Sequence, residues 1–112
     1  DVVAAVEEAD IVVLATPVYW WGVSAQLKLI IDKFYSRASK LEACTKKVGV
    51  IAIGEAEQDD AQYSLISMQF HCICRYLGWD VAFCNTYTAG EAGELAKNAE
   101  AMAELEELWK TL

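Results

Sequence analysis

The stretch IVVLATPVYWWGVSAQLKLIIDKF, residues 11–34, decides how this chain folds. It opens with the continuous apolar run Ile11–Ala15, which is typical of a strand covered on both faces in a parallel sheet. Pro17 has no backbone N–H to donate and ends that strand. The aromatic cluster Tyr19–Trp21 follows, and Ser24 then begins an amphipathic helical pattern as its N-cap. The order is therefore strand, aromatic loop and helix, and the other residues are interpreted around it.

The remaining residues continue the alternation of helices and apolar strands. We expect helices over residues 1–9, 24–38, 59–77 and 94–112, and strands over residues 11–15, 47–54 and 80–87. Residues 36–45 are expected to form a frayed helix end and a loop. Connections of crossover length predict parallel strands in a doubly wound, three-layer α/β sheet. The third strand alternates more than the others, which favours a place near a sheet edge.

Helical spacing predicts the buried side chains, and local signals predict the helix ends. The expected core residues are Leu27, Ile30, Ile31, Phe34, Tyr35 and Ala38 in the second helix, Ile66, Phe70, Ile73 and Leu77 in the third, and Leu95, Ala99, Met102, Leu105, Trp109 and Leu112 in the last. Asp59 is expected to cap the third helix together with Gln62. Gly78 is expected to end that helix, with Trp79 closing the cap by apolar contact.

Composition bounds the class of protein. The chain has 112 residues, enough for one domain, and its apolar content of 55% predicts a sizeable core. A formal net charge of -8 disfavours nucleic-acid binding. No segment reads as a membrane span or a signal peptide, so we expect no membrane partner. The four cysteines lack the spacing of a redox or zinc site, which favours reduced cysteines in a cytoplasmic protein.

The basic residues are unevenly distributed. Six of the nine lie between Lys28 and Lys47, where only Asp32 and Glu42 oppose them. This region is either a solvated helix surface or an anion-attracting rim beside a binding site. As a rim, it could receive the phosphates of NADPH.

Three loops are expected at the carboxyl ends of the strands, where open α/β sheets bind ligands: residues 16–23, 55–60 and 88–93. The first holds three consecutive aromatic residues, which are unfavourable to leave in water. Their planes suit stacking on a planar heteroaromatic ring. Alternatively, Tyr19, Trp20 and Trp21 belong to a dimer interface or fold into the core. Composition alone leaves these readings open.

At these residues the sequence resembles a known family. The segment TPVYWWGVSAQLKLIIDKF, residues 16–34, is similar to the loop and following helix of flavodoxin-like NAD(P)H-dependent FMN reductases, including the iron–sulfur flavoprotein branch. In that family a segment of the Pro-Val-Tyr-Trp type wraps the isoalloxazine ring of FMN. Residues 46–54 and 77–90 match the family more loosely and in the expected order. The resemblance covers essentially the whole chain, residues 1–112, as a single flavodoxin-like domain.

The resemblance implies a set of cofactor-binding residues and no obligatory catalytic side chain. The residues implied are Thr16, Pro17, Val18, Tyr19, Trp20 and Gly22, with Trp21 and Ser24 close by and Gly54 and Glu55 as a weaker match in the second loop. The implied reaction passes electrons from NAD(P)H through FMN to a small acceptor such as a quinone, flavin, nitro or azo compound, or metal ion. The cofactor performs that chemistry, and the protein supplies orientation and contacts. The alternative is a non-enzymatic electron carrier or binding module.

The sequence also departs from the family. Family members begin with a strand and a polar loop that hold the FMN phosphate at a helix N-terminus, and no such segment is visible in these residues. The cysteine cluster of the iron–sulfur members is absent as well. We therefore expect the carboxyl-terminal part of a flavodoxin-like domain, lacking the first two strands and the first helix. The strand over residues 11–15 would then be an exposed apolar edge, and we expect a homodimer or higher homo-oligomer.

Overall fold

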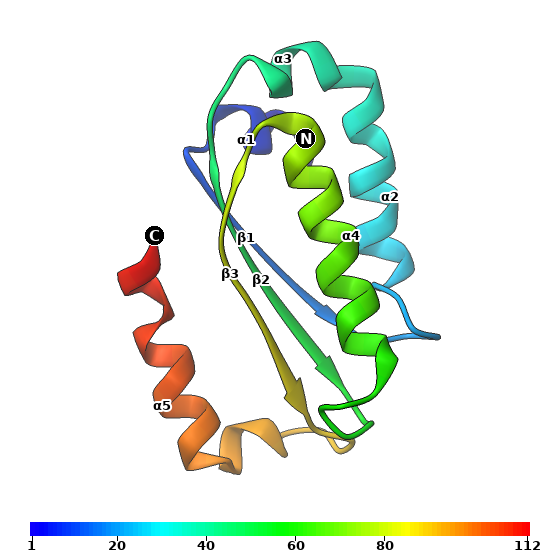
Figure 1. Ribbon diagram of the computed structural model, residues 1–112, viewed down its shortest axis with the longest axis vertical. Coiled ribbons are helices and arrows are strands. Elements are labelled where there is room, and N and C mark those ends of the chain that lie inside the picture. The colour runs from blue at the N-terminus through cyan, green and yellow to red at the C-terminus, as the bar shows by residue number, and fades with distance from the viewer.

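Three parallel strands form the centre of the fold in the computed structural model, which describes all residues, 1–112 (Figure 1). They are β1 (Ile11–Pro17), β2 (Lys47–Gly54) and β3 (Asp80–Thr88), in the order β1-β2-β3. Both neighbouring pairs are parallel, which confirms the predicted α/β sheet. The central strand is β2, so β3 lies at an edge as predicted, and β1 forms the other edge.

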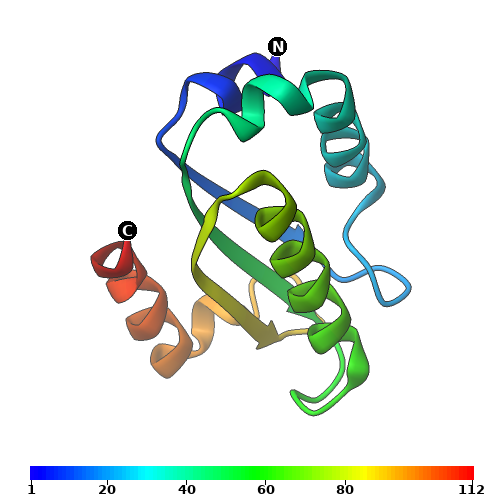
Figure 2. The ribbon, with the colours of Figure 1, turned by 45° about the horizontal axis from the view of Figure 1, so that its top comes forward.

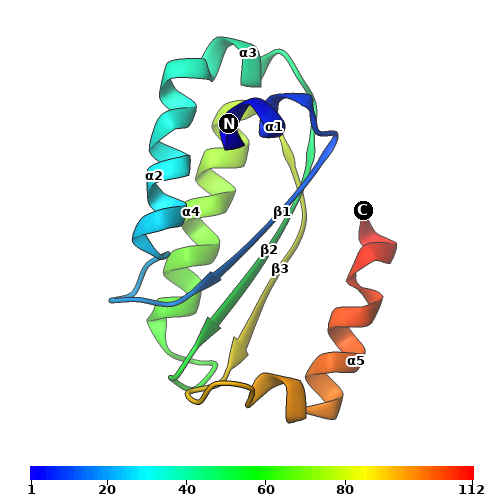
Figure 3. The same ribbon diagram turned by 180° about the vertical axis from the view of Figure 1, so that it is seen from behind.

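Helices cover the two faces of the sheet unequally. They are α1 (Val2–Glu8), α2 (Ala25–Lys33), α3 (Ala38–Glu42), α4 (Ala61–Leu77) and α5 (Ala99–Glu107). Helices α2 and α4 lie side by side on one face, whereas α5 lies on the other (Figures 1 and 3). The view in Figure 2 shows the sheet between these two layers. None of the helices combines the length and the hydropathy needed to cross a membrane.

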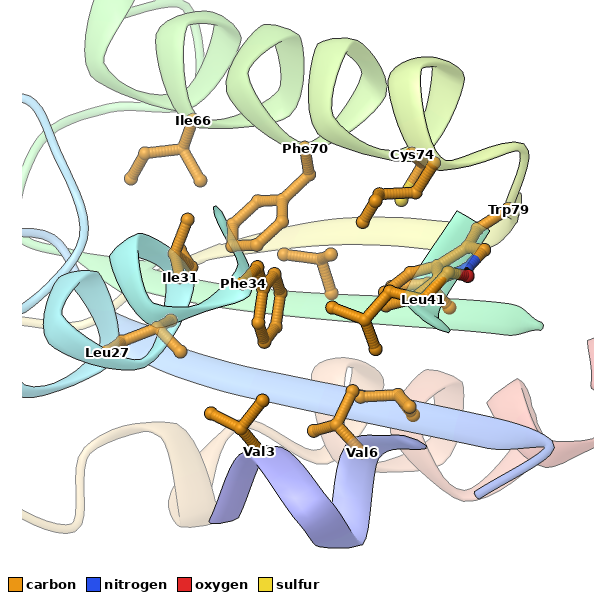
Figure 4. Packing of buried hydrophobic residues seen from close by; sticks show 14 of the residues in the cluster. Val3, Val6, Leu27, Ile31, Phe34, Leu41, Ile66, Phe70, Cys74 and Trp79 are labelled. Atoms are coloured by element: carbon orange, nitrogen blue, oxygen red, sulfur yellow. The ribbon is translucent and has the colours of Figure 1, made fainter. Parts of the chain in front are cut away.

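The main core lies between the sheet and the α2–α4 layer. Ile66 and Phe70 of α4 are fully buried there, and α1 adds Val3 and Val6 to the same cluster (Figure 4). The indole of Trp79 stacks edge-on against Phe34, with 5.9 Å between ring centroids, and donates from Nε1 to the Leu41 carbonyl at 3.0 Å. This single cluster ties together helices that are distant in the sequence.

The local helix signals are largely confirmed. Ser24 caps α2 by accepting a hydrogen bond from the Leu27 amide. Gly78 ends α4 in the left-handed conformation with φ of 73°, and the Trp79 amide donates to the Cys74 carbonyl at 2.8 Å. The cap of α4 is Asp60 rather than Asp59, because it is Asp60 whose side chain accepts from the Gln62 amide.

Tyr35 was expected in the core but is 88% exposed. The reason is that α2 ends at Lys33 and continues as a 3₁₀ helix, Phe34–Arg37. This tighter winding, with three residues per turn, rotates side chains away from the positions that α-helical spacing predicts. The following residues then form α3, where a loop was expected.

The expected last helix over residues 94–112 is wrong in extent and in burial. It is divided into a 3₁₀ turn (Leu95–Lys97), α5 and a second 3₁₀ turn (Leu108–Thr111), and Asn98 caps α5. Ala101 is the only buried residue of α5, and the predicted core residue Trp109 is 66% exposed. The segment therefore rests on the edge of the sheet at β3 without forming a second large core.

Strand β1 is covered on one face only, contrary to expectation. Val12 and Thr16 point into the core, whereas Ile11 and Val13 are exposed on the opposite face. That face carries α5 near β3 and no helix over β1 (Figure 3). The continuous apolar run therefore correctly predicted a strand and incorrectly predicted two covered faces.

Two residues of the basic region, Lys46 and Arg37, are used in contacts within the protein. Lys46 is buried, and its ammonium donates to the carbonyls of Glu7 and Ala9 at the end of α1. Arg37 forms an ion pair with Glu7 at 3.0 Å. These contacts lie at the amino ends of the strands, far from the ligand-binding end of the sheet, because Lys47 is the first residue of β2.

Candidate functional site

Three loops converge at the carboxyl ends of the strands. The Val18 amide donates to the Ile53 carbonyl at 2.8 Å, which joins the aromatic loop to β2. The Ala89 amide donates to the Gly54 carbonyl at 2.8 Å, which joins the loop after β3 to the same strand. These two hydrogen bonds extend the pairing of the strands beyond the regular sheet. They fix the positions of the three loops relative to one another.

A groove of about 580 Å³ lies between these loops. This volume falls within the range of about 300–1,000 Å³ that is typical of small-molecule sites. The groove mixes apolar side chains, glycine and two carboxylates, and its lining comprises Ala15, Thr16, Pro17, Val18, Tyr19, Ile53, Gly54, Glu55, Ala89, Gly90, Glu91 and Ala92. No lysine or arginine lines it. The groove therefore suits a flat, largely apolar ligand with polar edges.

The aromatic loop is a tight two-residue hairpin. The Tyr19 amide donates to the Gly22 carbonyl at 2.9 Å, and the Gly22 amide returns a bond to the Tyr19 carbonyl at 3.1 Å. Trp20 and Trp21 form the turn with φ values of 49° and 61°. Positive φ at both central residues defines a type I′ turn, which normally holds asparagine and glycine.

The two tryptophans are held in strained and exposed positions. Left-handed backbone at a bulky residue costs about 1–3 kcal/mol. Trp20 is nevertheless 91% exposed, and its ring centroid lies 6.0 Å from that of Trp21. Neither indole is folded into the core, which removes one of the alternatives left open by the sequence. Both indole rings instead lie at the surface of the protein, where their planes are accessible from outside.

Thr16 and Ser24 fix the base of the aromatic hairpin. The Thr16 hydroxyl accepts a hydrogen bond from the Ser24 amide at 3.0 Å and donates to the Pro17 carbonyl at 2.7 Å. Both residues are buried. Their side-chain oxygens are thus used within the protein, and Ser24 does not line the groove. Their role in the site is to fix where the aromatic loop leaves β1 and enters α2.

The loop after β2 is fixed by contacts from α4 and β3. The hydroxyls of Tyr63 and Thr88 each donate to the Ala56 carbonyl at 2.7 Å. A methyl group on Gly54 would lie 2.8 Å from Gln62 Oε1 and 3.0 Å from Val18 Cγ2, so a larger residue here would require these side chains to shift. Glu55 follows directly and therefore stands at a defined place in the groove wall.

The loop after β3 is fixed by a carboxylate. Glu94 accepts hydrogen bonds from the amides of Glu91 and Gly90, at 2.9 and 2.7 Å. These two bonds hold the pKa of the Glu94 carboxyl below its usual value. The amides of this turn are consequently occupied by the protein itself and are closed to an external anion.

A second groove of about 330 Å³ adjoins the first on the α4 side. Its lining residues are Val18, Trp20, Trp21, Glu55, Ala56 and Gln62. Val18 and Glu55 line both grooves, so the two are continuous along the aromatic hairpin. A ligand larger than one ring system could extend from the main groove toward the tryptophans.

The structure brings most of the predicted site residues together. Nine of the ten form the walls of the two grooves or the hairpin between them: Thr16, Pro17, Val18, Tyr19, Trp20, Trp21, Gly22, Gly54 and Glu55. The sequence reasoning missed the wall formed by residues 89–92 and the contribution of Gln62. The position of the third loop at the same sheet edge was the signal for residues 89–92.

The four cysteines are free thiols in the structure. All four are unpaired, and no group of histidine, cysteine and acidic side chains is arranged to hold a metal ion. Burial raises the pKa of the Cys74 thiol to about 11, with a smaller contribution from Asp80. Cys74 is therefore a protonated core residue, as its place on the inner face of α4 implies.

An open parallel sheet with its groove at the carboxyl ends of the strands defines a flavodoxin-like α/β protein. Two solved structures share this fold. The Trp repressor binding protein of Bacillus subtilis superposes with a TM-score of 0.82 at 22% identity, covering 96% of this chain and 72% of that protein. General stress protein 14 of Treponema denticola, solved in complex with FMN, has a TM-score of 0.72 at 20% identity, covering 100% of this chain and 74% of that protein.

The chain belongs to the NADPH-dependent FMN reductase family, whose family model matches residues 1–94. YwqN of Bacillus subtilis, named as an NAD(P)H-dependent FMN-containing oxidoreductase, is 27% identical over 120 residues, which cover 98% of this chain and 64% of YwqN. An iron-sulfur flavoprotein of Methanocaldococcus jannaschii is 34% identical over 71 residues, which cover 63% of this chain and 36% of the relative. The chain thus spans less than two thirds of either relative.

The groove fits one end of FMN better than the other. Apolar walls from Pro17, Val18 and Tyr19 suit the flat isoalloxazine ring. These 112 residues offer no free group of hydrogen-bond donors suited to the phosphate of FMN. The N-termini of α2 and α4 are capped by Ser24 and Asp60, and the amides of the third loop bind Glu94. The groove thus matches the shape and polarity of a flavin ring, and the residues around it offer no donor set for the phosphate.

Proposed function

We propose that this chain forms the flavin-ring half of an NAD(P)H-dependent FMN oxidoreductase. The observation that carries the proposal is the groove of about 580 Å³ between three loops, beside an exposed aromatic hairpin, in a chain of the FMN reductase family. When bound, FMN would accept a hydride from NAD(P)H and deliver electrons to a small acceptor such as a quinone, flavin, nitro or azo compound, or metal ion.

The side chains of the aromatic loop would hold and orient the ring. Tyr19 and Trp20 offer planes for stacking, worth about 0.5–1.5 kcal/mol per aromatic pair beyond area burial. Pro17 and Val18 supply the apolar wall that excludes water. Gly54 and Glu55 provide the facing wall, whose position is fixed by α4. No acid or base from the protein is needed for hydride transfer, so these residues act by binding and orientation.

Two features support the proposal that the sheet is completed by another part of the same domain. The backbone of β1 is unpaired on its outer side, and Val13 is 48% exposed on a face that no helix covers. An open apolar edge of this kind favours pairing with a further strand. A phosphate site in that part of the domain would complete the cofactor site.

The four unpaired cysteines support a reducing, cytoplasmic location, which fractionation of cells would test.

Flavin titration of the 112-residue chain tests the ring site separately from the phosphate site. We expect riboflavin to bind at least as tightly as FMN, because the groove contacts the ring, supplies no phosphate donor and is lined by the carboxylates of Glu55 and Glu91. Trp20→Ala should weaken binding of both ligands, whereas Trp109→Ala, which removes an exposed indole outside the site, should leave both unchanged. Absence of riboflavin binding, or a strong preference for FMN, would contradict this assignment.

Anaerobic addition of NADPH to the flavin-loaded protein distinguishes an enzyme from a carrier. An oxidoreductase loses the yellow absorbance of oxidised flavin on addition of NADPH. A flavin that is bleached by dithionite and unaffected by NADPH or NADH would indicate the electron-carrier alternative.

A further inference from the structure

The second groove, of about 330 Å³, is bordered by features that the main groove lacks. The indoles of Trp20 and Trp21 form part of its wall, together with Glu55 and Gln62. It lies where the aromatic hairpin stands beside the amino end of α4 (Figures 1 and 3). Its volume falls within the range of about 300–1,000 Å³ that is typical of small-molecule sites. The second groove therefore has room for a ligand of its own.

Trp20 and Trp21 differ from the other two tryptophans of the chain. Each of those two has a lysine ammonium over its ring, at 5.8 and 5.9 Å from the centroid: Lys46 over Trp79 and Lys110 over Trp109. No lysine or arginine lies over Trp20 or Trp21, whose side chains are 91% and 53% exposed. The face of an indole attracts a cation because its π electrons carry negative charge. These two faces are thus open to a cation from outside the protein.

The loops around the second groove carry charge of one sign. Residues 16–23, 55–60 and 88–93 contain five Asp or Glu residues and no Lys or Arg. All nine basic residues of the chain lie elsewhere. A concave surface lined by one sign of charge concentrates ligands of the opposite sign and repels those of the same sign. The groove therefore favours a cation over a ligand that carries phosphate, sulfonate or carboxylate groups.

Glu55 brings one of these carboxylates to the junction of the two grooves. It lines both of them and forms no ion pair with a basic residue of the chain. Its side chain packs against the third loop, since a Cβ on Gly90 would lie 3.2 Å from Glu55 Cγ. The other polar side chain of the second groove, Gln62, directs Nε2 to Asp60 Oδ1 at 3.3 Å. The charged group at this groove is thus an acceptor with its charge unbalanced.

We propose that the second groove binds a planar aromatic cation, such as an N-alkylated pyridinium, quinolinium or acridinium. The flat ring would stack on the indole of Trp21, and Glu55 would balance its charge. Trp20 lies beside this position, with 6.0 Å between the two indole centroids and 47° between their planes. One indole can therefore contact the face of the ligand while the other contacts its edge. Binding of the cation does not depend on flavin.

The role of such a cation in catalysis rests on the proposed function. The second groove adjoins the groove proposed for the flavin ring, so the bound cation would be the electron acceptor. The overall reaction is NAD(P)H + A⁺ → NAD(P)⁺ + AH. A C–H bond of the nicotinamide breaks, a C–H bond forms on the acceptor, and no proton is taken up or released. The product AH is neutral and loses its electrostatic attraction to Glu55 and the indoles, which favours its release.

Equilibrium dialysis of the flavin-free 112-residue chain tests the binding site. The two probes are the N-methylacridinium cation and acridine, which is uncharged at about pH 8. We expect the cation to bind about tenfold more tightly than acridine. Trp21→Ala should weaken binding of the cation about tenfold, because its stacking surface is lost. Glu55→Gln should weaken binding of the cation about fivefold and leave that of acridine unchanged.

Two matched controls separate the second groove from the main one. Tyr19 and Glu91 line the main groove and not the second. Tyr19→Ala and Glu91→Gln should therefore leave the Kd of the cation nearly unchanged. Circular dichroism should show an intact fold for both hairpin variants, because Tyr19 and Trp21 are exposed. Equal Kd values for the two probes, or equal effects of Tyr19→Ala and Trp21→Ala, would overturn the proposal.

Steady-state kinetics of the flavin-loaded protein with NADPH test the role as acceptor. The ratio of kcat/KM for N-methylacridinium to that for a neutral naphthoquinone should fall about fivefold in Glu55→Gln. An unchanged ratio would overturn the acceptor role. Two failures are distinguishable. Flavin that NADPH bleaches in a protein that does not bind the cation would overturn this inference alone. A chain that binds the cation and takes up no flavin would overturn the proposed function and leave the cation site.

Discussion

Tyr19 and Gly22 are joined by two reciprocal backbone hydrogen bonds that force the two residues between them, both tryptophans, into left-handed backbone. Such a turn is ordinarily made by asparagine and glycine. The bulky aromatic residues are thus retained at positions where they destabilise the free protein. The strained turn borders the groove at the carboxyl ends of the strands, so its two indoles can be exchanged without removing a core residue.

Replacing the turn residues should separate stability from binding. We expect the double substitution Trp20→Asn/Trp21→Gly to raise the free energy of unfolding by about 1–3 kcal/mol, because both new residues adopt positive φ readily. Urea denaturation measures this change. The same variant should bind riboflavin more weakly, since the aromatic planes are lost.

The matched control is Trp20→Phe/Trp21→Phe, which keeps aromatic planes and backbone strain. It should show nearly wild-type stability and retain part of the flavin affinity. A loss of stability in the Asn-Gly variant would show that the indoles contribute more to the fold than the strain removes.

Lys46 should be important for stability although it is a lysine. Its ammonium donates to the Glu7 and Ala9 carbonyls and lies 5.8 Å from the centre of the Trp79 ring. We expect Lys46→Met to lower the free energy of unfolding by about 1–3 kcal/mol, because the carbonyls would remain without a donor. The neighbouring exposed lysine gives the control, and Lys47→Met should change the free energy little. Equal effects of the two substitutions would contradict this role.

Gly49 should not tolerate alanine. A methyl group there would lie 2.1 Å from Cζ of Phe83, whose ring covers the glycine from the adjacent strand. Displacement of the ring should lower the free energy of unfolding by about 1–3 kcal/mol. In the background Phe83→Leu, the further loss caused by Gly49→Ala should be smaller. Additive effects in the double variant would show that the two residues do not interact.

Glu94 should order the third loop in a pH-dependent manner. Its folded pKa is lowered by the hydrogen bonds from Glu91 and Gly90, from an ordinary value of 4.5. The stabilisation is therefore complete above the unfolded pKa and is lost as pH falls through the folded pKa. Amide exchange at Gly90 and Glu91 should be faster in Glu94→Gln at pH 7 and should converge with the wild type in acid.

The control for this pH dependence is Glu100→Gln, on the exposed start of α5. It should leave amide exchange at Gly90 and Glu91 unchanged. A wild-type loop whose exchange is insensitive to acid would contradict the assigned role of Glu94.

The parts of this structure that follow from the sequence are those fixed by local chemistry. Ser24 and Gly78 mark helix ends through hydrogen bonds and backbone conformations that involve only nearby residues. The aromatic loop was placed at the ligand-binding edge because parallel topology brings the carboxyl ends of strands together. The identity of the cofactor, FMN, was predicted from the family resemblance.

Other features depend on contacts that no local pattern contains. The dipeptide Trp20-Trp21 does not predict a type I′ turn. Phe83 lies over Gly49 only because β2 and β3 pair in one particular register. Tyr35 looked buried because α-helical spacing was extended into a segment that winds as a 3₁₀ helix. The burial of Lys46 depends on acceptors in a helix nearly forty residues earlier, which no local pattern contains.

Acidic groups lie at one end of the sheet and a basic group at the other, and this arrangement affects how fast a nucleotide enters the groove. Glu55 and Glu91 line the groove, whereas the buried ammonium of Lys46 lies at the other end of the sheet. A doubly charged FMN molecule approaching this chain therefore meets a repulsive field, which salt screens over about 8 Å at physiological ionic strength. Its association rate, followed by stopped-flow fluorescence, should increase with added salt. Uncharged riboflavin should associate at a rate that is independent of salt.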